Sequence, residues 1–443
     1  MSRKLTLRRP SVLARQIGLT FILPLLLAAS LVRAQDAIRP SLAGEASAEA
    51  RRQSIDHIPY NLLVGPVRFR FSATAGLEYN DNINVAEVDT QDDFIFRPQV
   101  NFNALWPITQ LNSLRLDLGL GYAFYFDHSQ YNTNSILLAP NSQISFDVFV
   151  SDFRINFHDR FSLEQDPIGE PGLSNVADYG RFQNTGGVSV LWDLNKAVLT
   201  FGYDHYNFIA TNDDFEYLDR NADILNASLS FAATSTTGVG LEGTYVFNRY
   251  DQDVLNDSET FSIGAFLETQ LTNFLSVRVA GGYQNIEFDG STVTLGPFPD
   301  GFLPGGGNFL TFDDSASLDD YYVNVLISHR INAAITQRLS AGHESQLGVN
   351  SNYIKLNYVR HTATWNIINR TLLSTELFYE DAEDSGGFID EHLHRYGGAL
   401  SLGYQLTRHV TLGARYQYTQ KDSDVPLRDY KQNRVSLDGT YSF

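Results

Sequence analysis

The stretch SLRLDLGLGYAFYF, residues 113–126, decides the fold. Every second residue from Leu114 to Phe126 is apolar, whereas the residues between them begin with Arg115, Asp117 and Gly119. Successive side chains of a β-strand point to opposite faces, so the stretch has one apolar and one polar face. An α-helix would spread the leucines around its circumference. Because 14 residues are long for an ordinary strand, the stretch predicts a tilted β-strand that spans a membrane.

The last ten residues, RVSLDGTYSF, show the same alternation. Val435, Leu437, Gly439, Tyr441 and Phe443 share one face of the predicted strand. A terminal Phe with a Tyr two residues before it resembles the C-terminal signal of outer-membrane barrels. We therefore expect the barrel-assembly machinery to bind the chain through Phe443.

The alternation recurs from residue 69 to the C-terminus, and it predicts an all-β chain folded as a transmembrane antiparallel β-barrel of about 18 strands. Counts of 16 or 20 follow if one hairpin is misassigned, most easily at 181–192 or 223–233. The predicted strands are 69–79, 94–105, 113–126, 135–150, 153–165, 181–192, 197–209, 223–233, 238–250, 259–271, 274–288, 319–331, 335–346, 355–368, 371–381, 392–406, 410–420 and 431–443.

The connections between these strands alternate in length. After even-numbered strands they are short, as at Ser151-Asp152, 193–196, 234–237, Thr272-Asn273, 332–334 and Asn369-Arg370. After odd-numbered strands they run from about 8 to 30 residues. Bacterial barrels have short periplasmic turns and long extracellular loops, so the cell outer membrane is the expected location, with both termini in the periplasm.

A soluble β-sandwich is the main alternative to a membrane barrel. Its strands would be shorter, and its apolar face would be buried against a second sheet. Here aromatic residues gather near the strand ends of the apolar face, as in an interfacial girdle. They are Tyr79, Trp106, Tyr122, Phe126, Trp192, Tyr203, Tyr283, Trp365 and Tyr404.

Residues 1–34 are predicted to be a cleavable signal peptide. A basic segment precedes the apolar run 17–31, and small residues stand before a cut after Ala34. A membrane anchor is disfavoured because the run is shorter than the ~20 residues of a spanning helix. Residues 35–68 form a periplasmic N-terminal segment with a short helix near 43–53, either a loose tail or a plug in the lumen. The barrel then occupies residues 69–443.

The composition excludes several classes of function. The formal net charge is −19, which argues against nucleic-acid partners. There is no Cys, so disulfides, thiolate chemistry and Cys-based metal sites are excluded. GVGLEG at 238–243 matches a dinucleotide-binding pattern but lies within an alternating strand, where that pattern has no meaning. No enzyme motif or cofactor is predicted, although a Ser–His pair at the outer rim, as in a barrel phospholipase, is not decided by the sequence.

The polar face of the strands carries charges of both signs. These side chains form a wet pore with a transverse field, or salt bridges that brace the wall. The pore-lining candidates are Arg70, Arg97, Arg115, Asp117, Asp147, Arg278, Arg330, Arg338, Glu344, Arg360, Arg415 and Arg434.

The long loops are rich in carboxylates, for example at 81–93, 213–219 and 381–391. Such clusters can bind divalent cations, but solvated loops beside lipopolysaccharide are the commoner case. His392 and His394 could hold a metal with Glu391, although surface histidine pairs without a metal are far commoner. We therefore predict no metal site, and we expect outer-membrane lipids and lipopolysaccharide as partners.

The connection 289–318 differs from the other loops because its middle, GPFPDGFLPGGGNFLTF, is apolar. A loop this long is usually functional or disordered. We expect it to fold inward as a constriction, with an external partner contact as the alternative. The constriction-loop candidates are Phe298, Phe302, Phe309, Phe312, Asp313 and Asp314.

The stretch YNLLVGPVRFRFSATAGLEYNDNIN, residues 60–84, resembles the β-barrel porin-2 group of outer-membrane proteins, as does NAAITQRLSAGHES at 332–345. The resemblance covers roughly 60–443. It implies a porin-like channel for small hydrophilic solutes or, as the alternative, a non-conducting scaffold or partner of exopolysaccharide-export proteins. No catalytic residues come with it. We expect a monomer rather than a trimer, because no outward face is suited to a trimer contact.

Overall fold

The computed structural model describes residues 41–290, 292–295, 310–313, 317–368, 370–385 and 390–443. The predicted signal peptide lies outside these residues. No helix among the described residues is both long enough and apolar enough to cross a membrane. Strands dominate, and they form one sheet of 20 strands and one of two. The smaller sheet pairs β14 (Thr292–Leu295) with β15 (Leu310–Asp313).

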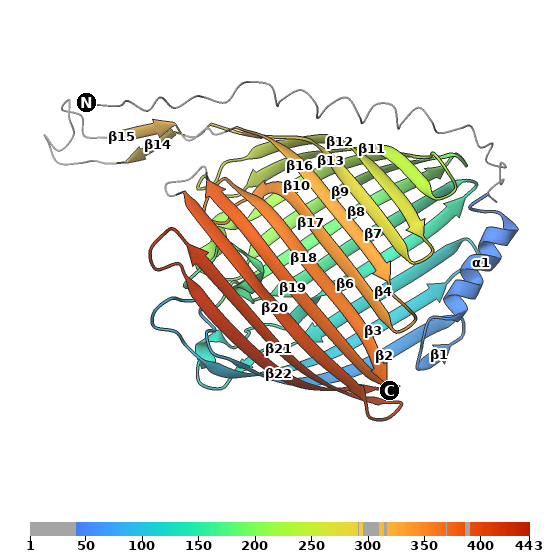
Figure 1. Cartoon of the computed structure of the whole chain (residues 1–443), viewed down its shortest axis with the longest axis horizontal. Coiled ribbons are helices and arrows are strands. Elements are labelled where there is room, and N and C mark those ends of the chain that lie inside the picture. Colours follow the sequence, from blue (N-terminus) through green and yellow to red (C-terminus); the bar gives the residue numbers. More distant parts are fainter. Residues whose placement is uncertain (1–40, 291, 296–309, 314–316, 369, 386–389) are drawn as a thin grey trace, which may run out of the picture. The chain divides into compact units, whose positions relative to one another are not determined.

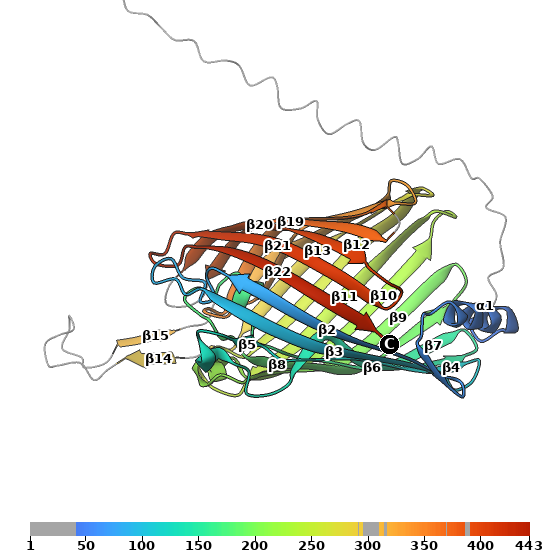
Figure 2. The same cartoon turned by 90° about the horizontal axis from the view of Figure 1, so that it is seen from below.

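The large sheet closes on itself. Its first long strand, β2 (Val67–Asn80), pairs antiparallel with its last strand, β22 (Tyr430–Ser442), from Ser72↔Ser442 to Asn80↔Arg434. The other barrel strands pair with their neighbours in chain order, and they wrap around the barrel at a tilt (Figures 1 and 2). Closure leaves no free strand edge, which the hydrocarbon of a membrane would not tolerate.

Eighteen strands make up the circumference, as predicted. Two of the 20 strands in the sheet do not add to the circumference. The short strand β1 (Leu62–Val64) pairs only with β2. The short strand β5 (Phe124–Tyr125) continues β4 (Asn112–Gly121) along the same neighbour, β3. The first half continues with β3 (Asp93–Pro107), β6 (Leu137–Val150), β7 (Phe153–Glu164), β8 (Arg181–Asp193), β9 (Ala197–Ala210), β10 (Arg220–Ala232) and β11 (Thr237–Tyr250). The second half comprises β12 (Ser258–Thr272), β13 (Leu275–Phe288), β16 (Leu318–Arg330), β17 (Ile335–Leu347), β18 (Tyr353–Ile368), β19 (Thr371–Ser385), β20 (Glu391–Gln405), β21 (Val410–Ser423) and the closing strand β22.

The outward face of the barrel is apolar and exposed. Leu77, Phe157, Leu241 and Leu437 all lie on it, and Leu437 is 60% exposed. Among the predicted girdle residues, eight of the nine are exposed, and Tyr79 is half-buried. A surface of this size and polarity is unsuited to water, but it matches the apolar band and aromatic girdles of outer-membrane barrels. The strands therefore span the outer membrane.

The connections between strands alternate between short turns and longer loops, as predicted, with one difference in length. In the short turns, Ser151 and Asn195 have positive φ values of 52° and 73°, which lets the chain reverse within few residues. The long connections are partly shorter than expected, since 348–352 has only five residues between β17 and β18. Some strands extend beyond their predicted ends, as β19 does to Ser385, whereas the predicted strand 113–126 is divided into β4 and β5.

One helix, α1 (Glu45–Asp56), precedes the barrel, near the predicted 43–53. Its sequence is rich in Ala and has Glu45 in the first turn, both of which favour a helix. The Arg51 guanidinium lies 3.7 Å from the centroid of the Phe149 ring, and Arg68 binds Asp56. Phe149 and Arg68 both lie on the face of the wall opposite to the exposed apolar residues. The helix is thus anchored at the mouth on the short-turn side, the end at which Figures 1 and 2 also show the C-terminus.

Candidate functional site in the barrel lumen

The structure places the twelve pore-lining candidates on the inner face. Along its strand, each candidate alternates with the exposed apolar residues and so points to the other face. In the register between neighbouring strands, inward residues stand opposite inward residues and outward residues stand opposite outward residues. Arg97 stands opposite Gly76, for example, and Leu77 stands opposite Phe96. The inner face therefore carries the charges that the sequence assigned to it.

Many of these charges form ion pairs between strands that are adjacent or that have one strand between them. Arg278 binds Glu242 at 2.6 Å, Arg360 binds Glu380 at 2.8 Å and Arg415 lies 3.4 Å from Glu376. Further pairs join Asp147 to Arg154, and Glu78 to Arg97 and Arg434. Asp117 accepts hydrogen bonds from Asn103 and Gln143. Glu344 lines a hollow of about 540 Å³ between β10, β11 and β17. Salt bridges thus brace much of the wall.

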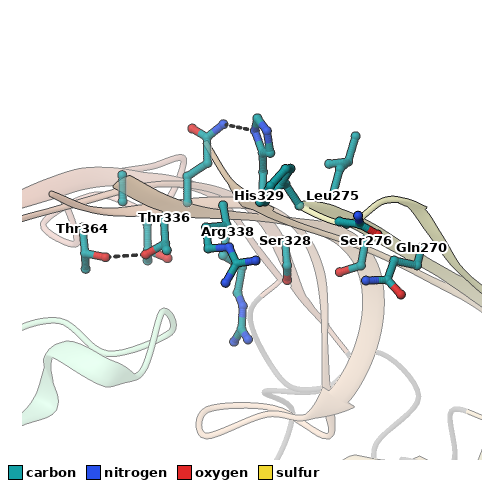
Figure 3. A pocket seen from close by; sticks show the side chains of 14 residues that line it. Gln270, Leu275, Ser276, Ser328, His329, Thr336, Arg338 and Thr364 are labelled. Atoms are coloured by element: carbon teal, nitrogen blue, oxygen red, sulfur yellow. Dashed lines mark hydrogen bonds between the residues drawn. The ribbon is translucent and has the colours of Figure 1, made fainter. Parts of the chain in front are cut away.

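Other arginines make no ion pair with any residue that the structure describes. Arg330 and Arg338 line a hollow of about 580 Å³ in the wall between β12 and β18, whereas Arg70 and Arg115 lie elsewhere on the inner face. Figure 3 shows Arg338 pointing to the same side as Ser276, Ser328 and Gln270, whereas His329 and Leu275 point away from it. Guanidinium and hydroxyl groups together can bind an anionic or hydroxylated solute.

The connection between β7 and β8, residues 165–180, crosses the lumen, and we call it the crossing loop. Asp166 binds Arg434 of β22 at 2.7 Å, and the Ile168 carbonyl accepts a hydrogen bond from Arg395 of β20 at 2.7 Å. Farther along, Asn350 donates to the Gly172 carbonyl at 2.8 Å. These partners come from β20, β22 and the connection between β17 and β18, all far from β7 and β8 around the circumference, so the loop joins opposite parts of the wall.

An apolar cluster holds the crossing loop in place. Leu173 and Tyr179 of the loop are buried with Phe208 of β9 and with Phe215 and Leu218, which belong to a 3-10 helix at Asp213–Leu218. The rings of Tyr179 and Phe215 meet edge to face, with centroids 4.9 Å apart. Because burial of such side chains is worth about 1.5–3 kcal/mol each, the loop is a folded part of the lumen rather than a solvated strap.

The loop environment shifts the pKa of its acidic groups in opposite directions. Burial acts to raise the pKa of Asp166, but Arg434 and Arg97 outweigh it and hold that pKa below its ordinary value. Burial raises the pKa of the Asp178 carboxyl. Burial also raises the pKa of the Tyr179 hydroxyl, so this group stays neutral at physiological pH. Asp166 is therefore a fixed negative charge of the loop.

Glu391 lies inside the barrel, which corrects the predicted grouping of Glu391 with His392 and His394. Its carboxylate binds Lys421 at 2.8 Å and Arg428 at 2.5 Å, and the side chains of Glu391 and Lys421 are 0% exposed. The two histidines follow on β20 but lie on the outer face beside Asp381. Adjacent strand residues point to opposite faces, so Glu391 cannot share a site with its neighbour.

The N-D-N motif at 80–82 has a structural role. Asn82 is 1% exposed, and its amide donates to the carbonyls of Ala86 and Lys431 at 2.8 and 2.9 Å. Asp81 accepts hydrogen bonds from the backbone and side chain of Asn433. The motif thus joins the first long loop to β22 through backbone and side-chain hydrogen bonds.

Most of the constriction-loop candidates lie outside the residues that the structure describes. Phe298, Phe302, Phe309 and Asp314 lie outside the described residues. Phe312 and Asp313 belong to β15, where they pair with Val293 and Thr292 of β14. The ends of the connection 289–318 thus form a hairpin, and its role as a constriction stays a prediction. Sequence reasoning missed the crossing loop, whose signal was Leu173, Val176 and Tyr179 among polar residues.

Comparisons with known proteins found structures but no sequence relatives. No family model and no curated protein matches the chain. OccK2 (OpdF) of Pseudomonas aeruginosa, in complex with glucuronate, is 11% identical with a TM-score of 0.47, over 86% of this chain and 100% of that one. The outer membrane protein OpdK of Pseudomonas aeruginosa is 11% identical with a TM-score of 0.45, over 85% and 99%. OccAB3 of Acinetobacter baumannii is 12% identical with a TM-score of 0.46, over 86% and 100%. Values this low do not assign a family or a solute to this chain.

Proposed function

We propose that the protein is a porin-like channel for small hydrophilic solutes and not an enzyme. The observation that carries the proposal is the hollow of about 580 Å³ in the wall, where Arg330 and Arg338 have no carboxylate partner among the described residues. A barrel of about 18 strands is wide enough to leave a lumen. Both arginines are exposed and Arg330 also lies over the Phe274 ring, so water or a solute can solvate the two guanidinium groups, which favours a wet passage.

The same proposal includes the orientation of the barrel in the outer membrane and the molecules that it contacts there. The short turns and both termini lie in the periplasm, and the long loops face outward beside lipopolysaccharide. Phe443 is 59% exposed at the end of β22, which leaves its ring accessible to the barrel-assembly machinery. The crossing loop narrows the passage from the extracellular side, so the solutes are small.

Conductance across a planar bilayer tests the proposal. We expect the folded wild-type barrel to conduct, and the variant Arg330→Gln/Arg338→Gln to pass anions less well relative to cations. Asp147→Asn/Arg154→Gln is the matched control, because it removes an ion pair of the inner face, 2.9 Å long, and leaves the net charge of the lumen unchanged. A silent record from barrel shown to be folded by heat-modifiable gel migration overturns the channel.

The crossing loop favours a second candidate, a non-conducting scaffold or partner of exopolysaccharide export. Its contacts with β20 and β22, and its apolar cluster, bring a folded segment across the lumen. If the wild-type record is silent but a variant that lacks residues 168–177 conducts, the loop is a plug and the scaffold is the better description. Equal conductance of both proteins removes this candidate.

A further inference from the structure

We propose that Asp381, His392 and His394 form a divalent transition-metal site of the Zn²⁺ type on the outer face of the barrel. Each of the three residues offers one ligand atom, and these atoms lie within 4.8 Å of one another. Two imidazoles and one carboxylate are a ligand set that zinc commonly uses, with a further position open to water. The site is independent of the lumen and of the proposed channel.

Regular β-structure positions the three side chains. His392 and His394 are two residues apart on β20, so both point to the same face. Asp381 stands directly opposite His394 in the register between β19 and β20. Because all three residues lie on paired strands rather than on a free loop, their spacing is largely set before a metal binds.

The distances are close to those that a metal requires. The Asp381 Oδ1 atom lies 3.0 Å from His392 Nε2 and 3.1 Å from His394 Nδ1. Ligand atoms about 2.0–2.1 Å from a tetrahedral zinc are about 3.3 Å apart. The two imidazoles are 52% and 45% exposed, so they can rotate by the small amount that coordination needs. A metal would then replace the hydrogen bond between Asp381 and His392 and the contact of His394 Nδ1 with the Tyr379 hydroxyl.

The surroundings favour a cation and place it at the membrane surface. Asp422 of β21 stands opposite His394, and Glu383, which is paired with Lys355 at 3.7 Å, stands opposite His392, so two more carboxylates border the three ligands. One residue pair nearer the membrane, Tyr379 stands opposite Tyr396, at the aromatic girdle. The site thus lies just beyond the apolar band, where water and ions reach it. Within the described part of the chain, it is the one such group of three potential ligands.

Calorimetric titration with ZnCl₂ tests the site in the folded full-length barrel, purified in detergent without a polyhistidine tag. We expect one saturable Zn²⁺ per chain. His392→Gln/His394→Gln and Asp381→Asn should each weaken binding at least about tenfold, because loss of second-shell partners alone costs about 10–100-fold. His205→Gln is the matched control, since His205 also faces outward and binds Asp223 at 2.9 Å but has no second imidazole beside it. Its affinity should equal that of the wild type.

Electron paramagnetic resonance of the wild type with one equivalent of Cu²⁺ makes the test independent of variant folding. Coupling to two imidazole nitrogens supports the site. The proposal is overturned if the wild type has no saturable Zn²⁺ site, if binding survives in the double-histidine variant, or if Cu²⁺ couples to fewer than two nitrogens.

Discussion

Arg434 binds Asp166 across the lumen, with its Nη1 atom 2.7 Å from the Asp166 Oδ2 atom, although the two residues lie in the last strand and in the crossing loop. The same guanidinium binds Glu78 of β2 at 2.9 Å. One arginine therefore joins the seam at which the barrel closes to the loop that crosses it. Closure of the barrel and placement of the crossing loop are coupled through this residue.

The first prediction concerns Asp166→Asn. The amide cannot carry the charge that Arg434 binds, so the crossing loop should open more often. Because Asp166 is 34% exposed, we expect a loss of about 1 kcal/mol, or about fivefold faster hydrogen exchange at Tyr179, whose N–H bonds the Gln165 carbonyl. Asp147→Asn removes a comparable carboxylate near the short-turn end of the barrel, and the exchange at Tyr179 should not change. Equal protection in the wild type and in Asp166→Asn would disprove the coupling.

The second prediction is the pH dependence of the crossing loop. The pKa of Asp166 is lowered in the folded state, so its contribution to stability is present above the ordinary Asp pKa and is lost as pH falls through the lowered value. Asp178 has a raised pKa, so its protonation at mildly acidic pH favours the folded loop. Exchange at Tyr179, corrected for its intrinsic rate, should therefore stay slow at mildly acidic pH and accelerate below about pH 4. Asp166→Asn should lack this acceleration, and a wild type that opens steadily from neutral pH downward would contradict the assignment.

The third prediction concerns the buried pair of Glu391 and Lys421. Glu391→Gln leaves an uncompensated ammonium among fully buried groups, which typically costs about 3–5 kcal/mol. The double variant Glu391→Leu/Lys421→Met removes both fully buried charges and leaves only Arg428, which is 26% exposed, without its carboxylate partner, so it should recover part of this stability. Urea unfolding from lipid vesicles measures both. Should the double variant be no more stable than the single one, the unpaired charge is not the cause of the loss.

The strands were predictable because lipid imposes a local rule. The outward residues from Leu114 to Leu120 of β4 and from Val435 to Tyr441 of β22 face hydrocarbon, so apolar residues recur at every second position and the final Phe443 follows the same pattern. The short turns were predictable for the same reason, since only a few residues separate two alternating runs. The helix near 43–53 was visible from its alanines.

The side-chain contacts between strands and loops were not predictable because they are not local. Nothing in the residues around Asp166 indicates that Arg434 is its partner, and the carboxylate of Asp381 meets His392 and His394 only through the register of β19 and β20. Glu391 was the nearest acid in sequence, but it lies on the other face of its strand. The alternation predicts which face of the wall a residue lies on. The strand register and the positions of the loops determine which side chains it contacts on that face.

The fourth prediction concerns the close approach of β12 and β13. A Cβ atom on Gly282 would lie 2.1 Å from the Ile263 carbonyl oxygen and 2.4 Å from the Gly264 Cα atom, both part of the backbone. Gly282→Ala should therefore destabilise the barrel by about 1–3 kcal/mol. Gly403→Ala is the control, because its Cβ would meet nothing nearer than 3.9 Å, and it should be neutral or stabilising by about 0.4–1 kcal/mol. Urea unfolding from vesicles compares the two variants, and equal stabilities would exclude the close contact.

The last prediction tests which face of the wall meets lipid. Leu437 lies near the middle of β22, points outward and is 60% exposed, whereas the adjacent Ser436 points into the lumen. An arginine on the lipid face near the bilayer midplane costs about 2–4 kcal/mol, because its charge must leave water. Leu437→Arg should therefore lower the unfolding free energy in vesicles by that amount. Ser436→Arg places the same charge in the lumen opposite Glu78 and should cost no more than about 1 kcal/mol. The reverse order of the two variants would mean that the apolar face points inward, and neither the membrane-spanning barrel nor the channel would then stand.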